Sequence, residues 1–338
     1  MARRWPLTTR SAIIYALPVV VAVFSLALGR YPVGPWAVVQ VLASRVLPIH
    51  QTWSPAVDTV VMQVRLPRVV LGLSIGGGLA IGGVSVQGLF RNPLVSPEIL
   101  GVSSAAGFGA ALAILISGAT LVINVFAFAF GFAGVLVTYA IARVKGTVPV
   151  VMLVLSGVIV ASFFGALISV LEYVADPQKK LPDIVFWLLG SLAGAQQSQA
   201  EVAGVLILAG SAVLIALSWR INLLSLGDEE ARSLGVRAEA VKAAVVAAVA
   251  VITAAAVAVS GIIGWVGLVI PHVARMLVGP DHRRLLPASF ALGATYLLLI
   301  DDLSRTVSTA EVPIGILTAV LGAPFFAVLL RRTKAGWS

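Results

Sequence analysis

The chain has 338 residues, of which 59% are hydrophobic and only 11% are charged, and its formal net charge is +9. This composition excludes an ordinary soluble domain, in which about 25% of residues are charged, and indicates a helical membrane protein. The absence of cysteine excludes disulfides and thiolate metal sites, and we expect this chain to bind no metal and no cofactor of its own.

Ten apolar windows approach the roughly 20 residues that a membrane-spanning helix needs. They are residues 12–28, 67–89, 98–117, 119–142, 150–171, 200–219, 240–259, 263–278, 286–303 and 313–330. We therefore predict an all-α polytopic membrane protein with about ten transmembrane helices in one domain, 1–338. The first window is interpreted as a retained helix, because no small-residue cleavage site follows it.

The 23 lysines and arginines are spread unevenly over the connecting segments. If the chain begins in the cytoplasm, most of them fall in segments on the inner side, as the positive-inside rule requires. We therefore interpret the net positive charge as a signal of membrane orientation. We expect the chain to contact membrane lipid and to bind no nucleic acid. Both the N and C termini are predicted to be cytoplasmic.

Three longer segments interrupt the helices, two outside (29–66 and 172–199) and one inside (220–239). In the second outer segment, the apolar run from Ile184 to Leu192 is too short to span a bilayer and predicts a half-helix. The inner segment reads "LLSLGDEEARSLGV", in which Gly227 and Gly235 bracket a short amphipathic helix. Ala231 and Leu234 should share one face of it, where a partner could attach.

The stretch "LFRNPLVSPEILGV" (89–102) is predicted to be an inner hairpin between the second and third helices. Asn92 precedes a proline and so favours the end of the second helix, and Ser96 with Pro97 is a typical helix start. The second helix itself carries glycines four residues apart, which predict close packing of helix backbones. These are Gly72, Gly76, Gly78 and Gly82.

Three arginines lie at the predicted outer ends of helices: Arg65 and Arg68 at the start of the second window and Arg305 after the ninth. Arginine here either anchors a helix by snorkelling or binds carboxylates of an acidic partner in a bidentate way. The centres of the ten windows contain no ionisable residue, and the chain has no GxxxxGK[ST] phosphate loop. The sequence therefore predicts that the energy for transport is supplied from outside this chain, and that any nucleotide chemistry lies on a partner. The alternatives are an ion-coupled secondary transporter, and a membrane enzyme using Asp301, Asp302 and Glu311.

Taken together, the motifs resemble the permease subunits of the iron-siderophore, haem and cobalamin branch of bacterial ABC importers. They are "RLPR" (65–68), "GLFRNPLVSPEILGVSSAAGFGA" (88–110), "FWLLGSLAG" (186–194), "GDEEARSLGV" (227–236), "GIIGWVGLVIPHVARMLVG" (261–279), "HRRLLP" (282–287) and "VPIGILTAVLGAPFF" (312–326). The resemblance implies a type II importer permease fold in the bacterial inner membrane. It also implies a homodimer with the transport path at its interface, two cytoplasmic ATPase subunits that carry ATP and Mg²⁺, and a periplasmic substrate-binding protein.

The resemblance also implies roles for particular residues, none of them catalytic. Coupling to the ATPase falls to Gly227, Asp228, Glu229, Glu230, Ala231, Arg232, Leu234 and Gly235. Docking of the binding protein falls to Arg65, Arg68 and Arg305, and the cytoplasmic gate to Asn92, Leu94, Pro149 and Val150. Haem is the favoured cargo, because a large amphipathic solute suits a path with apolar walls and few fixed hydrogen bonds. Lys179 and Lys180 near the outer mouth either meet its propionates or belong to a solvated loop with Asp176 and Asp183. Ferric siderophores, cobalamin and an oxyanion are the alternatives.

Overall fold

The computed structural model describes residues 7–308 and 310–333, and within them the secondary structure is helical apart from turns and one bridge between Val144 and Thr147. The α-helices are α1 (Leu7–Ala27), α2 (Pro35–Ala43), α3 (Pro55–Thr59), α4 (Leu66–Phe90), α5 (Val102–Ile116), α6 (Thr120–Ala142), α7 (Val150–Val174), α8 (Lys180–Leu188), α9 (Gln197–Ala216), α10 (Ser218–Leu224), α11 (Asp228–Ser233), α12 (Ala238–Ser260), α13 (Val266–Val278), α14 (His282–Thr306) and α15 (Ile314–Thr333). A π-helical turn, η1 (Val60–Arg65), joins α3 to α4, and a 3₁₀ turn, η2 (Pro97–Leu100), precedes α5.

Each of the ten predicted windows coincides with one helix. Six helices of the described chain are long and apolar enough to cross a membrane, namely those at 55–90, 120–142, 150–174, 197–216, 238–260 and 282–306. Four shorter apolar helices match the remaining windows, at 11–27, 102–116, 266–278 and 314–328. The all-helical membrane fold is confirmed, and the crossing of a bilayer by all ten helices stays a prediction.

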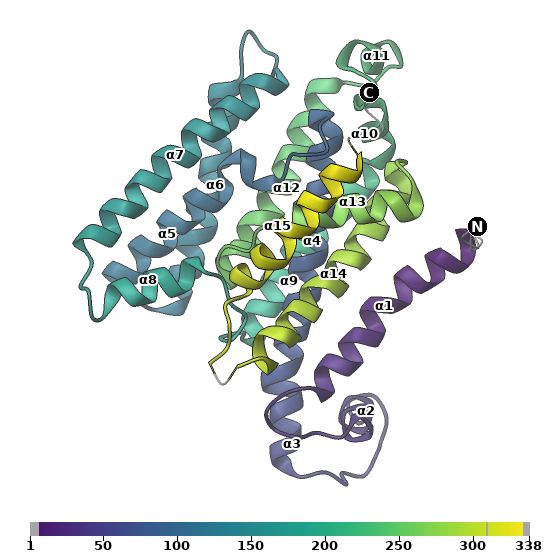
Figure 1. Cartoon of the computed structure of the whole chain (residues 1–338), viewed down its shortest axis with the longest axis vertical. Coiled ribbons are helices and arrows are strands. Elements are labelled where there is room, and N and C mark those ends of the chain that lie inside the picture. The colour runs from purple at the N-terminus through teal and green to yellow at the C-terminus, as the bar shows by residue number, and fades with distance from the viewer. Residues whose placement is uncertain (1–6, 309, 334–338) are drawn as a thin grey trace.

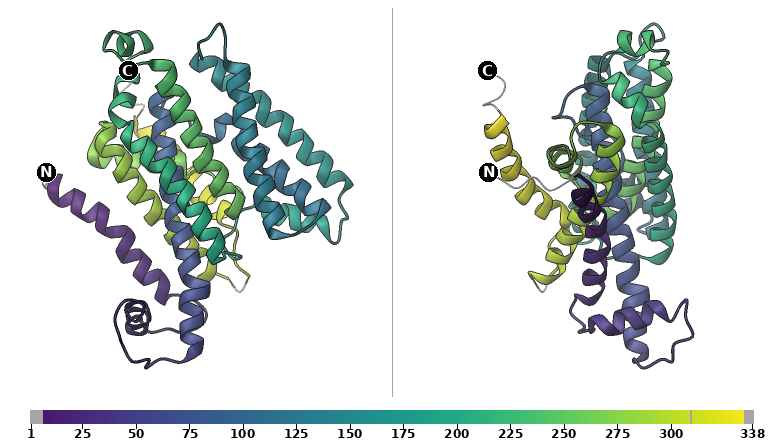
Figure 2. Two further views of the ribbon diagram at one scale, coloured as in Figure 1. Left: turned by 180° about the vertical axis from the view of Figure 1, so that it is seen from behind. Right: turned by 90° about the vertical axis from the view of Figure 1, so that its right-hand side faces the viewer.

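The helices are arranged around α4, which lies in the middle of the molecule with α9, α12, α13 and α14 (Figure 1). On one side of this group lie α5, α6, α7 and α8, and on the other side lies α1. The short helices α10 and α11 occupy one end of the molecule, and α2 and α3 occupy the opposite end. In side view, α15 leans away from the other helices (Figure 2). The two termini themselves lie outside the described residues.

The central helix begins well before α4. Residues Pro55–Phe90 form one continuous helical segment of 36 residues, which at 1.5 Å per residue is about 54 Å long, against a hydrocarbon core of about 30 Å. Nearly every residue from Pro67 to Phe90 is buried, whereas α3 contains no buried residue. The first turns therefore project beyond the buried part of the bundle and carry the 29–66 segment with them (Figure 1).

Glycines allow the backbones around α4 to touch. A Cβ on Gly76 would lie 2.2 Å from the Gly293 carbonyl oxygen on α14, and one on Gly83 would lie 2.0 Å from the Gly267 oxygen on α13. Close packing is confirmed at Gly76 and also at Gly78, where a Cβ would lie 2.5 Å from Ile207. Gly72 and Gly82 have room for a Cβ, with nearest neighbours at 3.4 and 3.5 Å. The four-residue spacing thus identified the packing face but not the positions where glycine is indispensable.

The third helix starts differently from the sequence expectation. Pro97–Leu100 form the 3₁₀ turn η2, and α5 begins only at Val102, because Gly101 adopts a left-handed conformation with φ of +77°. Ser96 is extended as an N-cap residue should be, but its hydroxyl accepts no capping hydrogen bond. The predicted start at Ser96 is therefore correct for the turn and wrong for the α-helix.

The 172–199 segment contains a short helix, α8, which has nine residues and is too short to span a bilayer. It runs from Lys180 to Leu188, so it begins and ends four residues before the predicted run from Ile184 to Leu192. It ends at a left-handed glycine, Gly190 (φ +74°). Beyond it, the backbone N–H of Ser191 donates to the Ser260 carbonyl at the end of α12 (2.8 Å), and the N–H of Ile314 donates to the Gly190 carbonyl (2.9 Å). The end of α8 is thus fixed between α12 and α15.

Candidate coupling and gating site

The predicted short helix of the inner segment is α11, at the end of the molecule that also holds α10 (Figure 1). Gly227 precedes it with φ of +143° and Gly235 follows it with φ of +80°, conformations that residues with a side chain rarely adopt. Its first turn is acidic, with Asp228, Glu229 and Glu230, which suits the partial positive charge of a helix N-terminus. The two glycines therefore fix the bounds of the helix, as predicted.

The faces of α11 differ from the expectation. Ala231 is fully buried, whereas Leu234 is 57% exposed. Leu234 is the C-cap residue, so it no longer follows the helical periodicity that would place it beside Ala231. The exposed side chains of this segment therefore include Glu229, Glu230, Arg232 and Leu234.

A lysine that the sequence analysis did not single out connects α11 to the rest of the chain. Lys242 lies in the second turn of α12, and only 4% of its side chain is exposed. Its Nζ donates to a carboxylate oxygen of Asp228, to Glu239 Oε1 (3.1 Å) and to the Val148 carbonyl oxygen (3.3 Å). The sequence signal is a single lysine within the apolar run "AEAVKAAVV".

The same cluster reaches the predicted gate at the start of α7. Glu239 Oε2 accepts a hydrogen bond from the backbone N–H of Val148 (2.9 Å). The next residue, Pro149, is the N-cap of α7, and Val150 is its first helical residue. The two polar groups of Val148, its N–H and its C=O, are thus both bonded to side chains of α12.

The other predicted gate residues lie in the 91–96 hairpin after α4. Arg91 ends α4 in a left-handed conformation (φ +50°), and Asn92 Oδ1 accepts from the N–H of Leu94 (2.9 Å). This Asx turn leaves Leu94 51% exposed. Among the hydrogen bonds of the described residues, none joins this hairpin to Pro149 or Val150.

The three outer arginines are buried, which corrects the expectation that they face outward. Arg65 is 4% exposed, and its guanidinium donates to the carbonyl oxygens of Leu26 (2.7 Å), Ala27 (3.0 Å) and Tyr31. These carbonyls belong to the end of α1 and the segment after it, where helix termini leave acceptors unsatisfied. Arg65 therefore holds the end of α1 against the start of α4.

Arg68 and Arg305 are bonded to the acidic residues that were considered as an enzymatic cluster. Arg68 donates from Nε and Nη2 to Asp301 (2.9 to 3.0 Å) and from Nη1 and Nη2 to Glu311 (3.1 and 2.9 Å). Arg305 forms an ion pair with Asp302, and it also donates to the carbonyl oxygens of Ser25 (2.7 Å) and Leu28 (2.9 Å). The arrangement ties α1, α4 and α14 together and uses the carboxylates for ion pairing. A docking role for the three arginines stays a prediction, and their surroundings here are those of structural residues.

A second cluster of polar residues, formed by Asn222, Asp281 and His282, lies near the end of α4 that faces α10. Asp281 caps α14 by accepting from the N–H of Arg283 (3.1 Å), and it accepts a further hydrogen bond from Asn222 Nδ2 (2.7 Å). These hydrogen bonds lower the pKa of Asp281 below its ordinary value. Asn222 Oδ1 in turn accepts from the N–H of His282 (2.9 Å). His282, which lies before the predicted window 286–303, is the buried first residue of α14.

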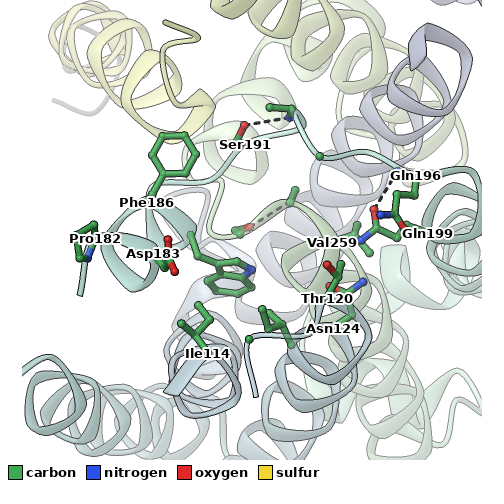
Figure 3. Close-up of a pocket in the computed structure, with 17 residues that line it drawn as sticks. Ile114, Thr120, Asn124, Pro182, Asp183, Phe186, Ser191, Gln196, Gln199 and Val259 are labelled. Carbon is green, nitrogen blue, oxygen red and sulfur yellow. Dashed lines mark hydrogen bonds between the residues drawn. The ribbon is translucent and has the colours of Figure 1, made fainter. Parts of the chain in front are cut away.

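A cavity of about 660 Å³ lies between α5, α6, α8, α9 and α12 (Figure 3). Polar side chains at its wall include Thr120, Asn124, Asp183, Ser191 and Gln199, and Phe186 contributes an aromatic ring. In the orientation of the Asn124 amide that satisfies both of its ends, the nitrogen donates to the Ala258 carbonyl (2.9 Å) and the oxygen accepts from Gln199 Nε2 (2.8 Å). The lining contains no basic residue, so this cavity does not favour an anionic ligand.

Comparison with known proteins gives a match over almost the whole chain. The family model described as the FecCD transport family matches residues 17–332. The molybdate import system permease MolB of Haemophilus influenzae is 43% identical over 320 residues, covering 95% of this chain and 94% of that protein. The hemin transport system permease HmuU of Yersinia pestis is 40% identical over 280 residues, covering 81% and 83%. A solved structure described as an inward-facing conformation of a metal-chelate type ABC transporter has a TM-score of 0.86 and 42% identity, covering 96% of this chain and 99% of that one.

Proposed function

Since the chain belongs to the FecCD transport family, as the permease subunit of an ABC importer, we propose that two copies of it pass an iron-containing chelate across the bacterial inner membrane. A permease of this kind is not an enzyme, and it works with a separate ATPase and a substrate-binding protein. We assign ATP and Mg²⁺ to the ATPase. The transport path would run between the two copies, closed on the cytoplasmic side near Asn92, Leu94, Pro149 and Val150.

The observation that carries this proposal is the position of α11. It stands at one end of a bundle of apolar helices, and its acidic residues Glu229 and Glu230 are exposed beside Leu234. A short helix with exposed charge and one exposed leucine is a suitable contact for another protein. We therefore propose that α11 docks on the ATPase, and that binding of nucleotide there moves the bundle between outward-open and inward-open states.

Haem is the first candidate cargo. The start of α7 belongs to the proposed gate, so α7 is the helix expected to face the path. It exposes apolar residues along its length, among them Leu155, Ile159 and Phe163. An apolar wall with few fixed hydrogen bonds suits a large amphipathic solute that must also be released. Lys180 is not free to meet a haem propionate, because its Nζ donates to the Ile114 carbonyl (2.7 Å). Of the two lysines, only Lys179 is exposed.

Molybdate is the second candidate, because the alignment with the molybdate permease of Haemophilus influenzae covers 95% of this chain. Ferric siderophores and cobalamin remain alternatives within the same family. The identities to the molybdate and hemin permeases, 43% and 40%, are too similar to choose a cargo by themselves.

The test is uptake by the permease reconstituted in vesicles with its own ATPase and binding protein, supplied with haem, a ferric siderophore, cobalamin or molybdate. We expect ATP-dependent accumulation of haem and stimulation of ATP hydrolysis by haem-loaded binding protein. Accumulation of another of these solutes in place of haem would refute the cargo and leave the permease function intact. Accumulation of a solute by the chain alone, without nucleotide or partners, would instead support an ion-coupled secondary transporter.

A further inference from the structure

We propose that Lys242 and Glu239 are positioning residues that transmit movement of α11 to the start of α7. The inference rests on the proposed function, because α11 would be moved by an ATPase docked on it. It identifies which side chains of this chain connect the docking helix to the proposed gate.

The Lys242 ammonium joins two segments that are far apart in the sequence. One of its contacts is the carboxylate of Asp228, the first residue of α11, and another is the carbonyl oxygen of Val148 in the turn before α7. The third is Glu239 Oε1 at 3.1 Å. A lysine ammonium has three N–H donors, so all of them are used. A change that separates Asp228 from Lys242 would leave a nearly buried charge without one of its two carboxylate partners, which is unfavourable.

Glu239 completes the connection to Val148. Its Oε2 accepts from the Val148 N–H (2.9 Å), while Lys242 donates to the Val148 carbonyl. The two side chains therefore hold both polar groups of one residue, and these contacts are made to the backbone. Since Pro149 follows directly as the N-cap of α7, displacement of Val148 changes the position of the first turn of α7.

A second contact between α11 and α12 is much weaker. Arg232 Nη2 lies 3.5 Å from Glu239 Oε1, with 51% of the arginine side chain exposed. Exposed ion pairs of this kind contribute only about 0 to 1 kcal/mol. Of the two described ion pairs that connect α11 to the residues bonded to Val148, the one between Asp228 and Lys242 is thus the stronger.

The experiment compares the ratio of solute imported to ATP hydrolysed in the reconstituted complex. Lys242→Met removes the ammonium and keeps a side chain of similar length. Asp228→Asn removes only the α11 end of the connection, at a residue whose side chain is 33% exposed. We expect each variant to lower the ratio at least tenfold while ATP hydrolysis continues. Lys145→Met, an exposed lysine in the same turn before α7, should keep the wild-type ratio.

The double variant Asp228→Asn/Lys242→Met separates transmission from stability. It contains neither the nearly buried ammonium nor the Asp228 carboxylate that pairs with it, so its apparent Tm should recover relative to Lys242→Met. If the residues act in series, its ratio should nevertheless be as low as that of either single variant. A double variant that regains both Tm and coupling would show that the single variants were merely misfolded, and would refute the inference.

The outcomes also separate this inference from the function on which it rests. A wild-type complex that shows no ATP-dependent uptake of any of the four solutes would contradict the proposed function. A wild-type complex that couples normally, with Lys242→Met equally well coupled, would contradict the inference alone.

Discussion

Arg68 and Asp301 form a bidentate ion pair between α4 and α14, in which 9% of the arginine side chain and none of the aspartate side chain is exposed. The residues are separated by 233 positions in the sequence. Glu311 binds the remaining edge of the guanidinium at 2.9 Å. This pairing joins α4 and α14, whose backbones also approach each other closely at Gly76 and Gly293.

We predict that Arg68→Ala destabilises the protein, because it leaves the buried Asp301 carboxylate with only the long ion pair to Arg305 (3.9 Å). Breaking a buried pair in this way costs about 3 to 5 kcal/mol. The matched control is Arg45→Ala, since Arg45 pairs with Asp58 at the surface, with 50% and 32% of the side chains exposed, and such pairs contribute at most about 1 kcal/mol. The measurement is the apparent Tm of the purified protein in detergent.

This comparison also decides the role that the sequence analysis gave to Arg68. If Arg68→Ala kept the wild-type Tm and lost only its affinity for the binding protein, the docking role would be right and the structural role wrong. Arg68→Lys should show an intermediate Tm, because lysine keeps the charge but lacks the planar fork that binds both carboxylate oxygens.

A second prediction concerns two adjacent glycines of α4. Gly83→Ala places a methyl group 2.0 Å from the Gly267 carbonyl oxygen, so α13 must move. Overpacking of this kind costs about 1 to 3 kcal/mol. Gly82→Ala meets its nearest neighbour, Pro97, at 3.5 Å, which is ordinary contact, and should be neutral or slightly stabilising.

The two variants are compared by thermal unfolding monitored by size-exclusion chromatography in the same detergent. Equal Tm values for Gly82→Ala and Gly83→Ala would contradict the close approach of α4 and α13.

The features predicted correctly from the sequence are those that depend on local pattern. Apolar length identified the ten helices, and Gly227 and Gly235 bounded α11, because a glycine with positive φ interrupts a helix wherever it occurs. The prediction that Leu234 shares a face with Ala231 failed, because α11 ends at Ser233 and Leu234 is its C-cap. The helical periodicity on which the prediction was based ends there.

Pairings between distant segments could not be predicted in the same way. Nothing near Arg68 in the sequence indicates that its partner is Asp301, and Lys242 acquires its role only because α11 and the turn before α7 both fold against α12. An unpaired arginine at a predicted helix end looks the same in the sequence whether it faces a partner protein or a buried carboxylate.

The N-cap of α14 gives a third prediction. Asp281→Ala removes the hydrogen bonds to the Arg283 N–H and to Asn222 Nδ2, and should lower stability by about 1 kcal/mol. Because these bonds lower the pKa of Asp281, its stabilising effect is complete above the ordinary aspartate range and is lost as the pH falls through the lowered pKa. Asp281→Asn keeps an acceptor oxygen without the charge, so its Tm should differ from wild type at neutral pH and converge with it in acid. A difference that persisted unchanged in acid would contradict this origin.

The last prediction concerns the exposed acidic residues of α11. Replacing Glu229 and Glu230 with lysine reverses the charge of the proposed ATPase contact and also places positive charge at a helix N-terminus, where it is unfavourable by about 0.3 to 1 kcal/mol. That local effect is small, so the protein should still fold and enter the membrane. Uptake per ATP hydrolysed should nevertheless fall at least tenfold, because complementary charge at a protein interface sets both association and orientation. Glu201→Lys serves as the control, since Glu201 is an exposed acidic residue of α9, at the end of the molecule away from α11. If the doubly substituted protein coupled hydrolysis to uptake as well as the Glu201→Lys protein does, α11 would not be the docking helix.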